Sequence, residues 1–297
     1  MKKLPSILAM LVLISGCELY QQDSYQELYV VESYLVADSF LPLVRLSTTG
    51  PIEDTYTFAD NAISGATVEI RKLNADSTVA ETFSYEQQLP GIYTSVTNAK
   101  VEDQRLYRLH VTTPGGDIIT STTYVPGNFT TINELENRYT YQSENQVAVT
   151  TTPSSYNTNR QTYYIFTVNA TDPDTVNLTP FYRDQVLEEG TKIEDFYINS
   201  SGIINESNYE RNENGTITLR VPWLAIAFFE TNEVIANAID DNMYDFLRSQ
   251  DVQTGGFTLS PGEIQNIRYN IEGGIGIFGS MASDTNQVYI SRPNITN

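Results

Sequence analysis

Short segments in which apolar and polar residues alternate recur along this chain, and this pattern constrains its fold more than any other feature. In the ranges 66–71 and 107–112 every second side chain is apolar and its neighbours are small or polar. A two-residue period places one face of a β-strand against a core and the other toward solvent. A cluster of Pro, Gly and Asp at 114–117 supplies a turn after the second segment. The sequence therefore predicts a mainly β fold.

The spacing of these segments predicts two domains in a chain of 297 residues. Strand segments separated by turns fill residues 28–126, which favours an immunoglobulin-like β-sandwich. Pro126-Gly127 breaks the pattern, and the range 128–159 is polar with weak strands at most. We expect a second β-rich domain over residues 127–297. Its expected strands cover residues 162–168, 216–221 and 287–291.

One short helix is expected in the second domain, over residues 233–249. Four apolar residues recur there at helical spacing, and Thr231 or Asn232 precedes them as a candidate N-cap. The four are Ile235, Ile239, Met243 and Phe246. We expect this helix to cover one face of the second sheet.

The first sixteen residues have the layout of an export signal, with two lysines followed by an apolar run at 7–14. Ser15-Gly16-Cys17 then resembles a bacterial lipobox, in which the chain is cut before the cysteine and its thiol takes a diacylglyceryl group. The alternative is a cysteine that follows a signal by chance. We expect a signal peptide over 1–16, lipidation of Cys17 with palmitate-like acyl chains, and a tether over 17–27. Two or three acyl chains, at about 0.8 kcal/mol per buried methylene, attach a protein to a membrane permanently.

The charge and the cysteine content of the chain limit which partners and which disulfides are expected. Removal of Lys2 and Lys3 with the signal leaves 15 basic residues against 37 acidic ones, a formal charge of −22. Nucleic acids and anionic lipid surfaces need basic patches, so we expect neither as a partner. Cys17 is the only cysteine, which leaves no intrachain disulfide.

The residue inventory argues against an enzyme. His110 is the only histidine and its strand alternation predicts a solvent-facing position, so neither a Ser-His-acid triad nor a multi-histidine zinc site is available. We expect no catalytic residues, no metal and no cofactor. A carboxylate-dependent glycosidase stays an alternative, although Glu188-Glu189 and Asp240-Asp241 are sequence neighbours whose side chains diverge. Calcium binding near Asp172 also stays open beside the simpler interpretation of an Asp-Pro turn.

The range 270–280 resembles the near-C-terminal signature of a family of Bacteroidota lipoproteins of unknown function, domain of unknown function 4249, whose genes commonly neighbour TonB-dependent receptors. Further landmarks similar to that family are the lipobox and the ranges 29–35, 65–70, 90–93 and 107–109. The resemblance implies a lipid-anchored outer-membrane protein, on the periplasmic or the cell-surface face. It also implies an accessory or ligand-capture role beside a TonB-dependent transporter, with the ligand unidentified. A surface adhesin or structural β-sandwich protein is the main alternative.

The same stretch supplies the candidate contact residues. If it forms a strand, Tyr269, Ile271, Ile275 and Ile277 share a core face. Gly274, Gly276 and Phe278 occupy the other face, which the glycines leave without bulk. Glycine inside a strand often marks a place where another backbone approaches closely. That backbone could belong to this chain or to a partner, and both alternatives stay open.

Overall fold

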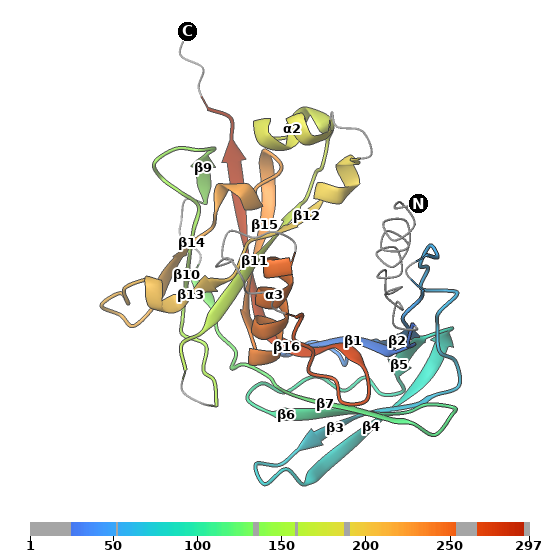
Figure 1. The fold of residues 1–297 in the computed structure, drawn as a ribbon. Coiled ribbons are helices and arrows are strands. Elements are labelled where there is room, and N and C mark those ends of the chain that lie inside the picture. The colour runs from blue at the N-terminus through green and yellow to red at the C-terminus, as the bar shows by residue number, and fades with distance from the viewer. Residues whose placement is uncertain are drawn as a thin grey trace, which may run out of the picture.

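The computed structural model describes residues 25–51, 53–132, 137–157, 160–186, 191–253 and 266–293 (Figure 1). The signal peptide, Cys17 and Glu188-Glu189 lie outside the described residues. Strands dominate the described chain, which confirms the mainly β prediction. They form one 13-stranded sheet and one 3-stranded sheet.

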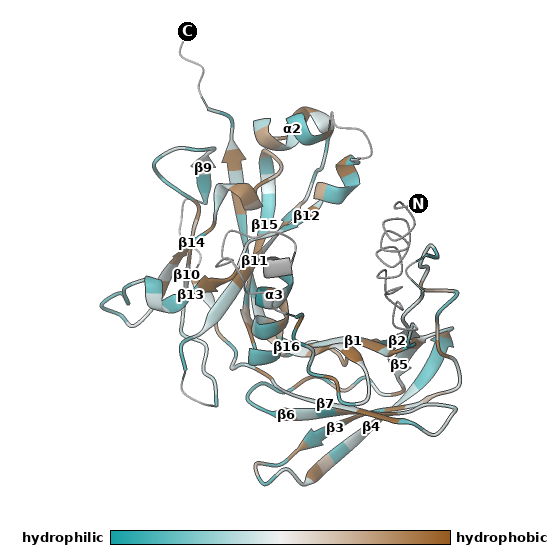
Figure 2. Ribbon diagram, viewed as in Figure 1, coloured by the Kyte–Doolittle hydropathy of each residue, from teal (hydrophilic) through white to brown (hydrophobic). Residues whose placement is uncertain are grey.

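The first half of the chain forms a curled sheet. Its strands are β1 (Tyr29–Val36), β2 (Val44–Thr48), β3 (Thr67–Leu73), β4 (Val79–Leu89), β5 (Ile92–Ser95), β6 (Leu106–Thr112) and β7 (Ile118–Tyr124). They are hydrogen-bonded in the order β1-β2-β5-β4-β3-β6-β7. Alternate side chains of β3 and β6 are buried, as the two-residue period predicted. Figure 2 shows hydrophobic stretches along β1 and near the end of the last strand.

The second half places a sheet between a smaller sheet and a helix. Its elements are β8 (Thr131–Ile132), β9 (Arg138–Thr140), β10 (Ala148–Thr151), β11 (Tyr163–Ala170), α2 (Pro180–Val186), β12 (Ile198–Ser200), β13 (Ile204–Asn205), β14 (Ile217–Arg220), β15 (Glu230–Ile239), α3 (Asp241–Gln253) and β16 (Ile275–Ser291). The three strands expected in this half lie within β11, β14 and β16 or overlap them. Strands β14, β10 and β8 form the 3-stranded sheet. One hydrophobic cluster includes residues of both sheets.

The longest strand, β16, joins the two halves. Its first part pairs in parallel with β1, from Val30 opposite Ile275 to Val36 opposite Met281. Its remainder pairs antiparallel with β15, as far as Ile290 opposite Glu230. The two arms of the molecule in Figure 1 therefore share one strand, and α3 lies in the corner between them. The predicted domain boundary at residue 126 stays a prediction, while the large sheet itself continues across it.

The structure corrects the helix over 233–249. Residues up to Ile239 form β15, which pairs with β11 on one side and β16 on the other, and the helix starts only at Asp241. Side chains 232, 234, 236 and 238 are all buried, so a two-residue period was present. Three of these four positions are an asparagine and two alanines, so the hydrophobic alternation in the sequence is weak. The N-cap is Asp240 rather than Thr231 or Asn232, because its carboxylate accepts from the amide of Met243 at 2.9 Å.

The polar range 128–159 also contributes more than expected. Val147 and Val149 have no exposed surface, and Tyr139 and Tyr141 are at most 6% exposed. All four belong to the main hydrophobic cluster. The strand formed here, β10, is short, as the expectation of weak strands at most allows, but its Val149 is fully buried in the core.

Candidate functional site

The glycine-rich stretch before and within β16 is packed against this chain's own backbone. A Cβ at Gly274 would lie 2.7 Å from the carbonyl oxygen of Tyr29, and one at Gly276 would lie 2.1 Å from that of Val31. The φ of Gly276 is +112°, a conformation that only glycine adopts without strain. The approaching backbone is thus β1, which β16 pairs with along this stretch.

Phe278 is a correction to the candidate contact set. Its side chain has no exposed surface, so it offers nothing to a partner in this conformation. Tyr269, which was assigned to the core, is 42% exposed, whereas Ile271 and Ile277 are buried as expected. Both faces of β16 are buried around residue 278, because β16 lies where the two halves of the molecule meet.

Asn270 fastens this stretch to the far edge of the first sheet. Its side-chain nitrogen donates to Ser121 at 2.8 Å and to the carbonyl of Phe278 at 2.7 Å, and its amide oxygen accepts from the backbone N–H of Phe278 at 3.0 Å. The backbones of Thr120 and Glu272 exchange two further hydrogen bonds, at 3.0 and 2.8 Å. The distinctive motif therefore closes β7 of the curled sheet against the segment that leads into β16.

A buried carboxylate lies beside this closure. Asp240 is 1% exposed, accepts from the hydroxyl of Thr123 at 2.5 Å and caps α3. Thr123 also lies 2.8 Å from the hydroxyl of Ser280, which donates to the carbonyl of Tyr124. Burial raises the pKa of Asp240 from 3.8 to about 6, against the lowering effect of the hydrogen bonds that it accepts. The cluster joins β7, α3 and β16 through one titratable group.

The other candidate polar residues are separated or already paired. Asp241 bonds Arg160 at 2.5 Å, away from the buried Asp240, so these adjacent carboxylates diverge as expected. Near Asp172, the side chain of Asp174 accepts from the amide of Val176 and so forms a local turn. No group of three or more His, Cys, Asp or Glu side chains suited to a metal occurs in the part of the chain that the structure describes. His110 is half-buried, and burial lowers its pKa, with Arg71 adding to the effect.

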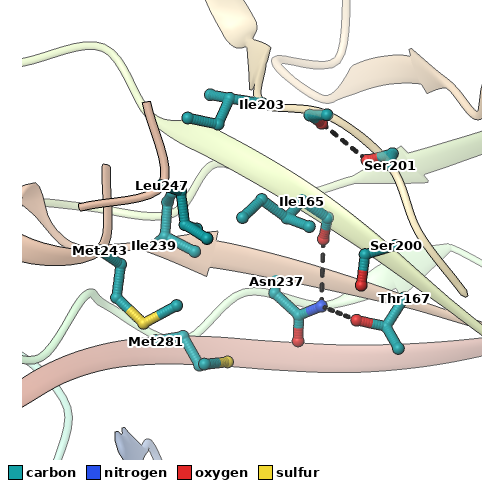
Figure 3. Close-up of a pocket in the computed structure, with 11 residues that line it drawn as sticks. Ile165, Thr167, Ser200, Ser201, Ile203, Asn237, Ile239, Met243, Leu247 and Met281 are labelled. Carbon is teal, nitrogen blue, oxygen red and sulfur yellow. Dashed lines mark hydrogen bonds between the residues drawn. The ribbon is translucent and has the colours of Figure 1, made fainter. Parts of the chain in front are cut away.

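The clearest binding feature is a pocket between α3 and the open face of the second sheet (Figure 3). Its volume is about 450 Å³, within the usual range for small-molecule sites. Strands β11 and β15 form its floor, α3 forms one wall and the turn after β12 forms the opposite wall. The apolar lining residues are Ile165, Ile203, Ile239, Met243, Leu247 and Met281. The polar ones are Thr167, Ser200, Ser201 and Asn237, and Gly202 also lines the pocket from the turn after β12.

Sequence reasoning missed this pocket for an identifiable reason. Ile239 and Met243 were assigned to one face of a continuous helix, but they line the pocket from a strand and from the following helix. The available signal was that Ile239 and Met243 face the same way, because only Asp240 separates the end of β15 from the start of α3. The turn after β12 carries no pattern that would have placed it opposite them.

No described helix is long and apolar enough to cross a membrane.

Comparison with known proteins identifies a family and gives only distant structural likenesses. A family model described as Domain of unknown function (DUF4249) matches residues 18–287. No curated protein matches the chain. Trypsin-activated alpha-2-macroglobulin from Escherichia coli is 8% identical with a TM-score of 0.22, over 73% of this chain and 14% of that one.

Two further solved structures are similar at the same low level. A tetra-tandem repeat from the extending region of a large adhesion protein is 11% identical with a TM-score of 0.24, over 89% of this chain and 49% of that one. Three N-terminal domains of the bacteriophage RB49 outer capsid protein Hoc are 9% identical with a TM-score of 0.23, over 90% and 71%. The chain thus spans less than half of the alpha-2-macroglobulin and the adhesion structure.

Proposed function

The chain belongs to the Domain of unknown function (DUF4249) family, and we propose that it is a Bacteroidota-type outer-membrane lipoprotein that captures a ligand for a TonB-dependent transporter. Three features support the proposal: a lipobox ending at Cys17, a β-rich body, and a preformed pocket in that body. The pocket carries the proposal, because a capture protein needs a site and this one already has the size and concavity of one.

The pocket walls are held by the fold rather than by loops alone. The floor strands β11 and β15 pair over eight residues, and α3 is capped by the buried Asp240. Preorganised walls reduce the ordering cost of binding. In this account the lipid on Cys17 holds the body beside a transporter, and the pocket presents the ligand there.

Membrane attachment is the first part to test. The full chain and its Cys17→Ser variant are expressed in a Bacteroidota host, and membrane and soluble fractions are compared. We expect wild type in the outer-membrane fraction with a diacylglyceryl adduct on its N-terminal peptide, and the variant without that adduct and released from the membrane. Equal membrane partition of the two proteins would contradict lipidation.

Transporter association is the second part. Wild type is purified from native membranes in mild detergent, and mass spectrometry compares its companions with those of an unrelated lipoprotein from the same cells. We expect enrichment of a β-barrel transporter with wild type only. A barrel protein found equally with both, or with neither, would overturn the transporter role.

A further inference from the structure

The pocket lining contains no ionisable side chain. Six apolar side chains, including Met243 and Met281, account for most of it. Moving an ion from water into such surroundings without a partner costs far more than moving a neutral polar group. The whole chain has a formal net charge of −20, which disfavours an anion further. The apolar part of the pocket therefore disfavours a charged group.

The polar groups gather at one end of the pocket. Figure 3 shows Thr167 and Ser200 on one side, and Leu247 and Met243 on the other. The ligand-facing surface thus changes from hydrocarbon beside α3 to hydroxyl groups beside β12. Methionine side chains at the apolar end adapt to irregular hydrocarbon shapes.

Two hydroxyls at the polar end retain hydrogen-bonding capacity. The side-chain nitrogen of Asn237 donates to Thr167 Oγ1 and to the carbonyl of Ile165, each at 3.0 Å. Thr167 acts as the acceptor in that bond, so its own O–H proton is available. Ser200 is exposed at the mouth of the pocket, and its hydroxyl bonds no other side chain or backbone group among the described residues. Asn237 itself is satisfied, because its oxygen accepts from Ser283 at 2.7 Å.

We propose that this pocket binds an uncharged amphipathic molecule, with a hydrocarbon body against α3 and one neutral oxygen group at Thr167 and Ser200. The proposal rests on the proposed function in using the same pocket, and it specifies the ligand's chemistry. A hydroxyl or an ester carbonyl on the ligand would accept from the Thr167 O–H. Burial of the hydrocarbon body supplies the main driving force.

The test compares two probes that differ only in their end group. 1-Decanol and decanoate at pH 8 displace the neutral dye N-phenyl-1-naphthylamine from the full chain carrying Cys17→Ser, measured without detergent. We expect 1-decanol to bind at least about tenfold more tightly than decanoate, because the pocket offers no cationic partner to a carboxylate at the half-buried Thr167. Equal or tighter binding of decanoate would overturn the proposal, as would absence of any displaceable dye.

Variants locate the binding. A Cβ at Gly202 meets nothing within 4 Å, so Gly202→Trp adds bulk at the pocket wall without a backbone clash. Gly115→Trp is the matched control, since a Cβ there makes only ordinary contacts in a turn far from the pocket. We expect Gly202→Trp to abolish 1-decanol binding and Gly115→Trp to leave it unchanged. Loss in both variants, or in neither, would show that the probe binds elsewhere.

Thr167→Val tests the polar end. Valine keeps the shape and removes the hydroxyl, so 1-decanol should bind about 2- to 10-fold more weakly while the dye alone is unaffected. Equal affinity of Thr167→Val and wild type for 1-decanol would contradict the assigned role of Thr167.

Binding of 1-decanol without transporter copurification would refute the transporter role and leave the proposed ligand chemistry standing. Copurification of a transporter without 1-decanol binding would refute the proposed ligand chemistry and leave the transporter role standing.

Discussion

Asp240 shows how one residue can stabilise a local structure while it opposes the fold as a whole. Its carboxylate caps α3 and accepts from Thr123, yet burial raises its pKa to about 6. A folded-state pKa above the unfolded value means that the folded protein binds the proton more tightly. The resulting stability is fully present below pH 3.8 and is lost as the pH rises through about 6.

Asp240→Asn should therefore stabilise the protein at pH 7, by up to about 3 kcal/mol. The amide oxygen can keep the cap, and its nitrogen can donate to Thr123, whose hydroxyl then donates to Ser280. Urea unfolding between pH 4 and 7 should show a smaller fall in stability for the variant than for wild type. Asp240→Ala is the control: it should share the weaker pH dependence but be about 1 to 2 kcal/mol less stable than Asp240→Asn, because it lacks the cap. A pH dependence identical to wild type in Asp240→Asn would contradict the assigned pKa.

Gly276 is the position where a side chain is least tolerable. Gly276→Val would place Cβ against the Val31 carbonyl at a φ that valine avoids, so it should lower the free energy of unfolding by roughly 3 kcal/mol or prevent folding. Gly202→Val, at an open position, should change stability by less than about 1 kcal/mol. Chemical denaturation of both variants measures the difference. A Gly276→Val protein as stable as the control would show that β1 and β16 do not pair as described.

At the scale of elements, alternation predicted strands such as β3 and β6, and it failed where the alternating residues were small or polar. The helix expected over 233–249 is the main example. Ala236 and Ala238 lie at buried positions of β15, and alanine gives no clear strand pattern in the sequence. Hydrogen bonds to β11 and β16 decide the conformation there, and both partners are distant in sequence. The pocket could not be predicted for the same reason, since its walls meet only after those pairings form.

Asn270 links two elements that no local pattern connects. Asn270→Ala removes two donated hydrogen bonds and one accepted bond between β7, the closing segment and β16, which should cost about 2 to 4 kcal/mol. Asn61→Ala removes a single side-chain hydrogen bond, to the Thr57 carbonyl, from a half-buried residue and should cost less than about 1 kcal/mol. Thermal unfolding of the pair gives the comparison. Equal losses would mean that the closure contributes nothing beyond a surface bond.

At the scale of the whole molecule, the first and last described strands are neighbours. Parallel pairing of β1 with β16 requires nearly the entire chain to be in place, and the sequence gives no sign of which distant segment will complete the first sheet. The alternating pattern of residues 28–126 could predict a sandwich-like sheet there. It could not predict that this sheet is closed by residues 270–281.

This arrangement predicts that residues 28–126 do not fold alone. The fragment would expose the edge of β1 that β16 covers and would lose the bonds to Asn270 and Glu272. Its one-dimensional proton NMR spectrum should lack dispersed amide signals, whereas the full chain should unfold in a single transition. A dispersed spectrum with a cooperative melt for the fragment would show that the N-terminal sheet is independent.

We propose that the protein captures a neutral amphipathic ligand in the pocket beside α3. Native mass spectrometry of wild type and Gly202→Trp, both purified from native outer membranes, tests it most directly. Wild type should carry a small molecule that is absent from Gly202→Trp, and extraction should identify an uncharged compound with a hydrocarbon body and an oxygen group. The same bound molecule in both proteins, a charged one, or none in wild type would contradict the claim.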